Sequence, residues 1–280
     1  MKVFKIMALA VLLFSSTAHA AQFGGVEETS VYLAPHYFTW EEFYQGQKLL
    51  REQGWLIGGG GLVKVNLRKA ETGSFMLTGR AELFGGVADY DGQTQSVNLQ
   101  GDSVPSLPVS TDAVYFGAKG EADFGWRVSM QQVSVEPFFG LGSRWWLRHL
   151  KASTTLDMMG SPARVDSATE EWSSLYLRLG GRLETVINND WRLFVEGGLK
   201  YPFYTENSFN VAGIDVTVKP DGRWSGFAEL GVRYKQLKFS TYYEGFRYGR
   251  SDGVPLGYIG VFQPTSKSDT IGFRVGWVLQ

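Results

Sequence analysis

Apolar and polar residues alternate with a period of two along most of the chain, and the period of an amphipathic helix is nearly absent. Such alternation is typical of β-strands with one apolar and one polar face. In segment 191–204, for example, apolar residues hold the odd positions and charged residues hold several of the even ones. The pattern predicts ten strands: Val31–Trp40, Trp55–Arg68, Ser74–Ala88, Ala113–Val128, Val133–Arg148, Leu175–Ile187, Trp191–Tyr204, Trp224–Lys235, Leu237–Arg250 and Thr270–Gln280.

The connections between these strands alternate in length. Tight turns are expected at 69–73, 130–132, 188–190 and near Gln236, and long polar loops at 42–54, 90–111, 151–171, 205–222 and 251–269. Outer-membrane barrels have short periplasmic turns and long extracellular loops, and an even strand number leaves both termini in the periplasm. We therefore predict an all-β fold, a transmembrane antiparallel up-and-down β-barrel of ten strands with five long extracellular loops.

The tryptophans distinguish this fold from a soluble sandwich or a lipocalin-like barrel, whose strands would also alternate. None lies in the middle of an expected strand. Those near the short turns or the C-terminus are Trp126, Trp191 and Trp277, and those near the long loops are Trp40, Trp55, Trp145, Trp146, Trp172 and Trp224. Aromatic residues form belts at the two membrane–water interfaces of such barrels. We expect Trp55, Trp126, Trp145, Trp191, Trp224 and Trp277 to form these belts.

Charged residues share the polar parity of the strands, which a barrel in lipid turns toward its lumen. The expected lumen ion network comprises Arg80, Glu82, Lys119, Glu121, Arg127, Glu136, Arg178, Arg182, Glu184, Arg192, Glu196, Lys200, Glu229, Arg233, Glu244 and Arg274. The same parity points Lys64, Arg68, Asp123, Arg144, Arg148, Lys235, Lys238 and Arg250 inward. Base therefore exceeds acid in the expected lumen, and acid exceeds base outside it. Only Arg247 breaks the rule, near the outer end of its strand.

This lumen has two interpretations. It is either a conduit biased toward anions or a packed network of ion pairs that fills a narrow barrel. We favour the packed network, because a ten-stranded barrel is only slightly wider than an eight-stranded one, whose interior side chains just fill it. An acidic rim would also repel anions before they reached the lumen.

The first residues are typical of a secretory signal. Lys2 and Lys5 precede an apolar run, and Ala18-His19-Ala20 is a small-x-small cleavage site. Residues 1–20 are expected to be a cleaved signal peptide, and 21–280 a single barrel domain of a Gram-negative outer membrane. With 27 Lys and Arg against 28 Asp and Glu, a nucleic-acid partner is not expected. Without cysteine the chain has no disulfide, thiolate metal site or Cys nucleophile.

A signal peptide, ten strands, five long loops and a charged lumen resemble the ten-stranded outer-membrane barrels, of which the omptin surface proteases are enzymatic members. The resemblance covers the mature chain in architecture but is weak in motif. Omptins hold a pair of aspartates at the outer end of the third strand, where this chain has Asp89-Tyr90-Asp91. They also need Asp-x-His in the fourth outer loop, and segment 205–222 has no histidine.

No metal-ligand cluster or catalytic set stands out, and no cofactor is expected. We expect a non-enzymatic structural or surface-recognition protein that acts through its outer loops. Its expected partners are outer-membrane lipid, lipopolysaccharide, the barrel-assembly machinery and an extracellular ligand at the loops. Two alternatives remain open, a narrow anion-biased channel and a hydrolase at the loop mouth that uses Asp89, Asp91 and His149.

Overall fold

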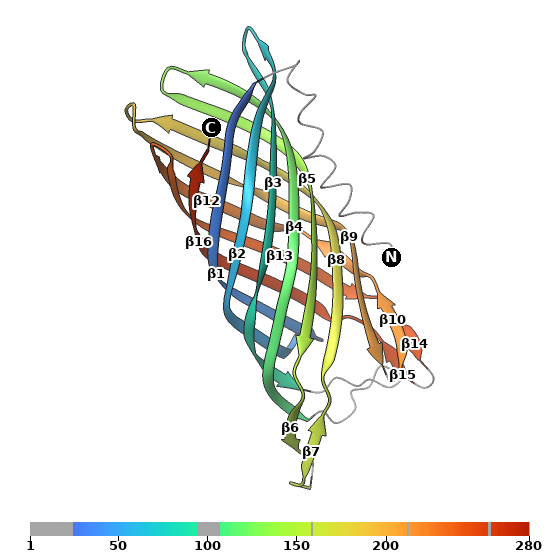
Figure 1. The fold of residues 1–280 in the computed structure, drawn as a ribbon. Coiled ribbons are helices and arrows are strands. Elements are labelled where there is room, and N and C mark those ends of the chain that lie inside the picture. Colours follow the sequence, from blue (N-terminus) through green and yellow to red (C-terminus); the bar gives the residue numbers. More distant parts are fainter. Residues whose placement is uncertain (1–24, 94–106, 158, 212, 257–258, 280) are drawn as a thin grey trace.

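The computed structural model describes residues 25–93, 107–157, 159–211, 213–256 and 259–279, which form a tilted antiparallel β-barrel (Figure 1). The expected signal peptide, 1–20, lies outside these residues. Among the residues that the structure describes, no helix has the length and hydrophobicity to span a bilayer.

Ten strands form the closed ring of the barrel, so the expected up-and-down β-barrel is confirmed. Each pairs antiparallel with its neighbours along the chain, and the first pairs with the last, from Ser30 opposite Val278 to Phe43 opposite Thr265. The ring strands are β1 (Val26–Tyr44), β2 (Gln47–Ala70), β3 (Gly73–Gln93), β4 (Pro108–Met130), β5 (Val133–Leu150), β8 (Ala168–Val186), β9 (Trp191–Val211), β12 (Ser225–Tyr234), β13 (Leu237–Ser251) and β16 (Thr265–Val278).

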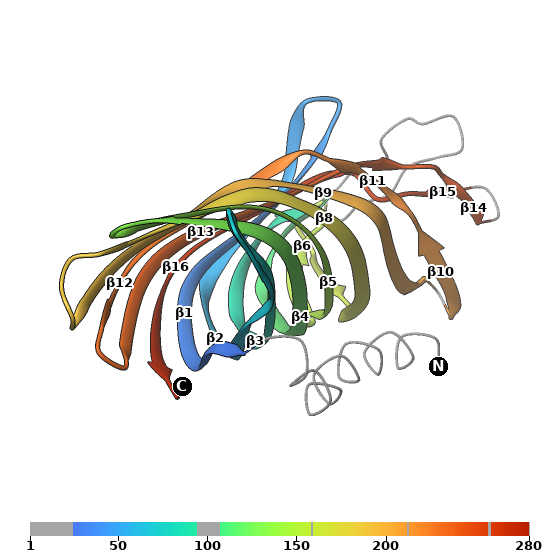
Figure 2. The same cartoon turned by 90° about the horizontal axis from the view of Figure 1, so that it is seen from above.

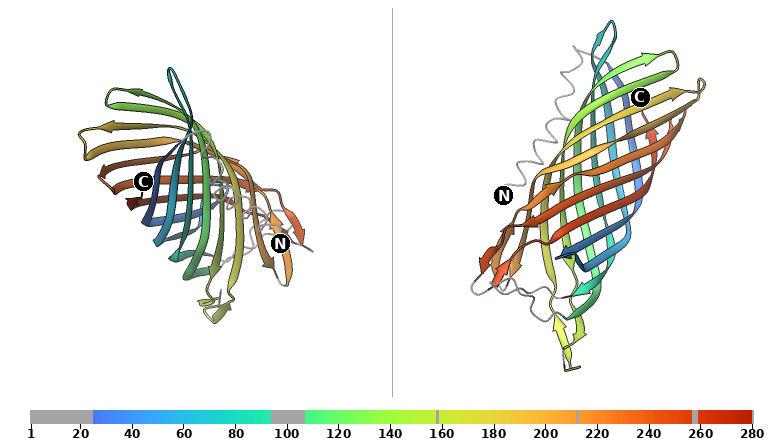
Figure 3. Two further views of the ribbon diagram at one scale, coloured as in Figure 1. Left: turned by 45° about the horizontal axis from the view of Figure 1, so that its top comes forward. Right: turned by 180° about the vertical axis from the view of Figure 1, so that it is seen from behind.

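Six short strands lie at the end of the barrel opposite the C-terminus, as the two views in Figure 3 show. We call this the loop end, and the opposite end the turn end. The short strands are β6 (Ser153–Leu156), β7 (Pro162–Val165), β10 (Ile214–Val218), β11 (Pro220–Arg223), β14 (Val254–Leu256) and β15 (Ile259–Val261). They form the hairpins β6–β7 and β14–β15 and extend the sheet beside β9 and β13.

Segment 42–54, expected as a loop, is instead a continuation of two strands. β1 and β2 remain paired through it, and only Gln45 and Gly46 form the turn, both with positive φ (51° and 82°) as a two-residue hairpin turn requires. β2 has 24 residues, whereas a tilted strand needs about 9–11 to cross a bilayer. The extra length carries the sheet beyond the apolar band of the wall, where polar residues on both faces hide the alternation.

The outer wall carries a continuous apolar band. Its exposed side chains come from every ring strand and include Val31, Leu33, Ile57, Leu83, Phe116, Phe139, Leu141, Leu177, Leu179, Leu193, Val195, Leu199, Leu230, Phe239, Ile271, Phe273 and Val275. A soluble monomer rarely exposes a contiguous apolar patch of more than a few hundred Å². The band therefore matches the lipid-facing surface of a membrane barrel. Seen from above in Figure 2, the strands wrap around the interior of the barrel. Buried side chains such as Phe38, Tyr176 and Arg178 fill this interior.

Candidate functional site

The lumen contains a dense network of buried ion pairs. Arg178 on β8 lies at its centre, with Nη1 2.7 Å from Glu121 and 3.0 Å from Asp123, and Nη2 2.8 Å from Glu196. These carboxylates come from β4 and β9, which flank β5 and β8. One guanidinium thus joins three acids across neighbouring strands, and the planar fork of arginine suits such multiple contacts.

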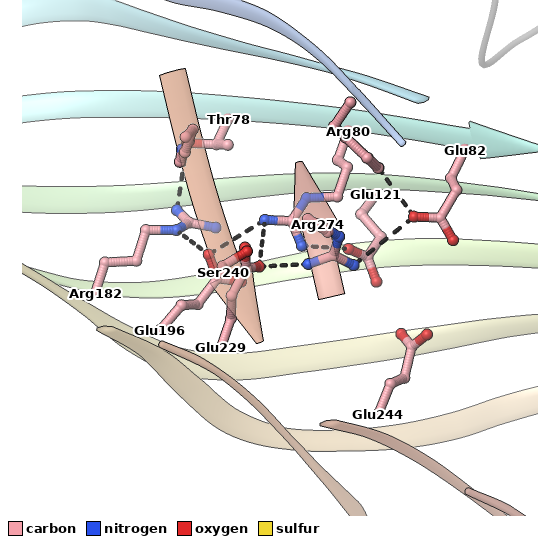
Figure 4. Close-up of polar contacts among 12 residues, drawn as sticks. Thr78, Arg80, Glu82, Glu121, Arg182, Glu196, Glu229, Ser240, Glu244 and Arg274 are labelled. Atoms are coloured by element: carbon pink, nitrogen blue, oxygen red, sulfur yellow. Dashed lines mark hydrogen bonds and ion pairs between the residues drawn. The ribbon is translucent and has the colours of Figure 1, made fainter. Parts of the chain in front are cut away.

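Two more arginines extend the network around the lumen (Figure 4). Arg182 contacts Glu196 and Glu136, each at 2.8 Å, and also pairs with Asp123. Arg80 reaches from β3 to Glu121 at 3.7 Å and to Glu196 and Glu229, each at 3.5 Å.

The cations of the layer nearer the loop end are Lys119, Lys200 and Arg274. Lys119 on β4 lies 2.7 Å from Glu244 on β13 and 3.7 Å from Glu82 on β3. Lys200 pairs with the same Glu244, and its Nζ lies 3.1 Å from Glu121. Arg274 on β16 pairs with Glu229 and lies 3.7 Å from Glu82.

The remaining residues of the expected network lie toward the turn end of the barrel. Arg127 contacts Glu136 at 2.8 Å, and Arg233 lies 3.7 Å from Glu28. Glu184 and Arg192 pair at 3.1 Å, but both are partly exposed at the rim. The structure therefore brings most of these residues together inside the barrel and leaves the Glu184–Arg192 pair at its edge.

The excess of base in the lumen is much smaller than expected. Arg68, Lys235 and Arg250 share the inward parity but are exposed at the ends of their strands. Glu28, Glu42 and Glu52, which were expected outside the barrel, are buried inside it. The physical reason is that β1 and β2 extend further at both ends than the alternation indicated, so their terminal acids enter the lumen and offset its cations.

Six tryptophans lie on the outer wall, near its two ends. Trp55, Trp191, Trp224 and Trp277 are exposed, and Trp126 and Trp145 are half-buried. Most of them pack on an outward aromatic ring of an adjacent strand, such as Tyr37 against Trp55 at 5.8 Å between ring centroids. Trp126 packs on Phe75 in the same way at 4.5 Å, and Trp191 on Tyr234 at 4.7 Å.

Three tryptophans near the long loops lie inside the barrel rather than in a belt. Trp40, Trp146 and Trp172 are at most 1% exposed. Trp146 stacks on Trp172 with 5.2 Å between centroids and an interplanar angle of 11°, and Trp40 meets Trp172 edge-on at 5.1 Å. With Phe38, Phe84, Tyr115, Tyr176, Phe246 and Tyr248 they form what we call the aromatic plug.

Arg144 lies against three rings of the aromatic plug. Its guanidinium carbon lies 4.7 Å from the ring centroid of Trp146, 5.0 Å from that of Phe246 and 5.1 Å from that of Phe84. Arg144 is 6% exposed, so the rings provide most of its surroundings. Cation–π attraction strengthens where water is excluded. Lys200 joins the plug to the ion network, because its Nζ lies 4.9 Å from the ring centroid of Phe246 and 3.1 Å from Glu121.

A second ionic cluster covers the aromatic plug at the loop end. Nε of Arg148 donates to Oε1 of Glu52 over 2.8 Å, and Nη1 donates to Glu170 over 2.7 Å. Tyr115 donates its hydroxyl to Glu52 from the plug side. The alternation placed Arg148 inward, but it did not predict the partners because Glu52 lay in an expected loop.

The space left inside this end-to-end packing is small. A cavity of about 50 Å³ lies toward the turn end, lined by Lys64, Arg80, Arg182 and Glu136 among others. It has room for a few water molecules. Its polar lining fits water, and the aromatic plug separates it from the loop end.

The residues considered for hydrolysis do not face the lumen. Asp89 and Asp91 are exposed on β3, while their neighbours Ala88 and Tyr90 are buried. His149 is exposed, and its Nδ1 lies 2.8 Å from the Thr169 hydroxyl. Among the described residues, no group of three or more His, Cys, Asp or Glu side chains is arranged to hold a metal ion.

The sequence matches no protein-family model and no curated protein. Among solved structures, the outer membrane protease OmpT from Escherichia coli is similar, with 8% identity and a TM-score of 0.55 over 91% of this chain and 98% of that chain. The transport unit of the autotransporter AIDA-I from Escherichia coli matches with 9% identity and a TM-score of 0.41 over 87% and 89% of the two chains. The likeness to OmpT, with a TM-score above 0.5, shows that the chain has the fold of an outer-membrane β-barrel, and the expected architectural resemblance is confirmed.

The β domain of the Bordetella autotransporter BrkA also matches, with 14% identity and a TM-score of 0.38 over 89% of this chain and 99% of that chain. At these identities the likeness extends to the fold alone.

Proposed function

We propose that this protein is a non-enzymatic outer-membrane β-barrel with a closed lumen, which acts at the cell surface as a structural or recognition protein. The observation that carries the proposal is the aromatic plug seated on the buried ion network. Nine aromatic side chains and a network of paired charges occupy the interior, and Arg80 on β3 reaches Glu229 on β12, on the opposite side of the ring. The loop end faces the outside, and the short turns and both termini face the periplasm.

The positions of the three candidate catalytic residues support a non-enzymatic role. Asp89, Asp91 and His149 project from the wall instead of converging at the barrel mouth. A nucleophile or an activated water needs a base within hydrogen-bond reach that is itself held by a third group. His149 has the Thr169 hydroxyl as its partner. In a catalytic triad the group that holds the histidine is a carboxylate.

The alternative of an anion-biased channel would need a basic and open path. The acids buried with β1 and β2 supply counter-charges to the cations at both ends of the lumen, as in the contact of Lys238 with Glu28 at 2.9 Å. Single-channel recording tests the proposal, because a closed barrel gives no steady conductance. We also propose that the barrel contacts outer-membrane lipid and that the barrel-assembly machinery inserts it.

A further inference from the structure

Three cations converge on one carboxylate on the outward face of the barrel at the loop end. Oε1 of Glu41 lies 3.4 Å from Nζ of Lys48 and 3.8 Å from Nε of Arg51, and Oε2 lies 2.6 Å from Nζ of Lys267. The three cationic side chains are 39–48% exposed, whereas that of Glu41 is 14% exposed. We call these four residues the Glu41 cluster.

The backbone register assembles the Glu41 cluster. Glu41 on β1 stands directly opposite Arg51 on β2 and Lys267 on β16. Residues that are directly opposite in an antiparallel pair project from the same face, so these side chains form one row across three strands. Lys48 joins them from the start of β2, where it is opposite Phe43.

The row continues to Arg247 on β13, which is opposite Lys267. Arg247 is bound within the wall, because it donates to Asp269 over 2.6 Å and to the carbonyl oxygens of Phe246 and Ser268, each over 2.9 Å. The positive charge of Arg247 is therefore neutralised by Asp269. The donors that a ligand can reach are those of Lys48, Arg51 and Lys267.

The height of the Glu41 cluster follows from the aromatic belt. Tyr37 and Trp55 are paired in the belt, and Glu41 and Arg51 are paired four residues further out on the same two strands. At about 3.3 Å per residue and a tilt near 45°, this separation is about 9 Å in height. The headgroup layer extends about 5–8 Å beyond the hydrocarbon core. The backbone of the cluster thus lies just beyond this layer, and its lysine and arginine side chains are long enough to reach back to the lipid headgroups.

The charge and donor balance of the cluster defines its ligand. An ammonium has three donors and a guanidinium five, and Glu41 takes one contact from each cation. Two positive charges and several donors remain, which match a phosphate group. Below them on the same wall, Trp55 and Ile57 are about 60% exposed, so a ligand held here would have its hydrocarbon part on an apolar surface.

We propose that the Glu41 cluster binds the phosphate of a phosphorylated lipid in the outer leaflet, with Lys48, Arg51 and Lys267 as donors and Glu41 as the residue that holds them together. The phosphorylated lipid A anchor of lipopolysaccharide has this chemistry. The inference rests on the proposed function in one respect, because the loop end must face the outer leaflet.

The test is a binding titration of the purified barrel in neutral detergent with lipid A, with the same lipid after removal of its phosphates, and with inorganic phosphate. A triple variant, Lys48→Gln, Arg51→Gln and Lys267→Gln, removes the donors. Each cation near a lipid surface is worth about fivefold in affinity, so the triple variant is expected to bind lipid A at least tenfold more weakly. Lys69→Gln, an exposed lysine at the turn end, is the matched control and is expected to bind as the parent does.

Equal affinity of lipid A and its phosphate-free form, or an unchanged affinity in the triple variant, would overturn the inference. If inorganic phosphate displaced lipid A at an equal concentration of phosphate groups, the ligand would be free phosphate and not a lipid. The orientation is measured separately by adding protease to intact cells, which should cut the β6–β7 hairpin. Uncut cells would contradict the proposed placement, and cut cells without lipid A binding would contradict the Glu41 cluster alone.

Discussion

Arg148 and Glu52 form a buried ion pair across the mouth of the barrel, with Nε of the guanidinium 2.8 Å from a carboxylate oxygen. Arg148 is 2% exposed and Glu52 is fully buried. The pair joins β5 to β2 over the aromatic plug, and it shields both charges from the apolar rings beneath. A buried pair of this kind destabilises a protein strongly when one partner is lost, since the other charge is left without compensation.

We expect Arg148→Met to lower the free energy of unfolding by about 3–5 kcal/mol, because Glu52 and Glu170 would lose their cation. Urea titration of the barrel in detergent micelles, followed by tryptophan fluorescence, measures this change. The control is Arg164→Met, whose pair with Asp166 is exposed, and where a loss below about 1 kcal/mol is expected. Similar losses in the two variants would show that the mouth cluster is not a buried network.

The aromatic plug gives a second prediction. Trp146→Ala removes a ring that is stacked between Trp172 and the Arg144 guanidinium, and a loss of about 3–5 kcal/mol in unfolding free energy is expected. The neighbouring Trp145 faces outward, so Trp145→Ala is expected to cost less. The same urea titration compares the two, and a larger loss at Trp145 would contradict the plug.

The alternation of the strands was sufficient to predict the barrel and its inward charges, and it also contained the signal for the plug. Trp146 shares its parity with Arg144 and Arg148, so the strand pattern already pointed it inward. The tryptophans were grouped by their distance from loops and turns, and that grouping did not use the parity. Parity is the stronger rule here, because successive side chains of a strand lie on opposite faces of the barrel wall.

The ion-pair partners could not be predicted from the sequence. Arg148 and Glu52 are 96 residues apart, and their contact depends on the tilt and stagger of all the strands between them. Glu42 and Glu52 were also hidden, because polar residues on both faces of an extended hairpin have no apolar alternation to mark it as strand.

The outward parity predicts which positions avoid water. The chain has no cysteine, so single cysteines can be introduced at Leu177, Leu193 and Met159 without a background. A charged maleimide should label Met159→Cys quickly, because this position is 93% exposed at the β6–β7 hairpin. Leu177→Cys and Leu193→Cys should stay unlabelled in cells, since lipid covers them. Labelling of all three at similar rates would exclude the lipid-facing wall.

If the barrel is non-enzymatic, it should cause no hydrolysis at the cell surface. Cells that produce the protein, incubated with fluorogenic peptides and with lipid esters, should cleave them no faster than cells without it. The exposed positions of Asp89, Asp91 and His149 on the wall are the physical reason. Cleavage that disappears in His149→Ala would contradict this prediction and favour a hydrolase at the loop mouth.

The closed lumen is tested most directly by the current through single barrels in a planar lipid bilayer. The aromatic plug and the ion network block the path in series, so we expect no steady conductance from the parent protein or from Trp146→Ala. Arg182→Glu serves as the matched variant, because Arg182 joins Glu136, Glu196 and Asp123 in the narrow part of the network. A silent bilayer with confirmed insertion is the predicted result. A stable, anion-selective current that is abolished by Arg182→Glu would contradict the closed lumen.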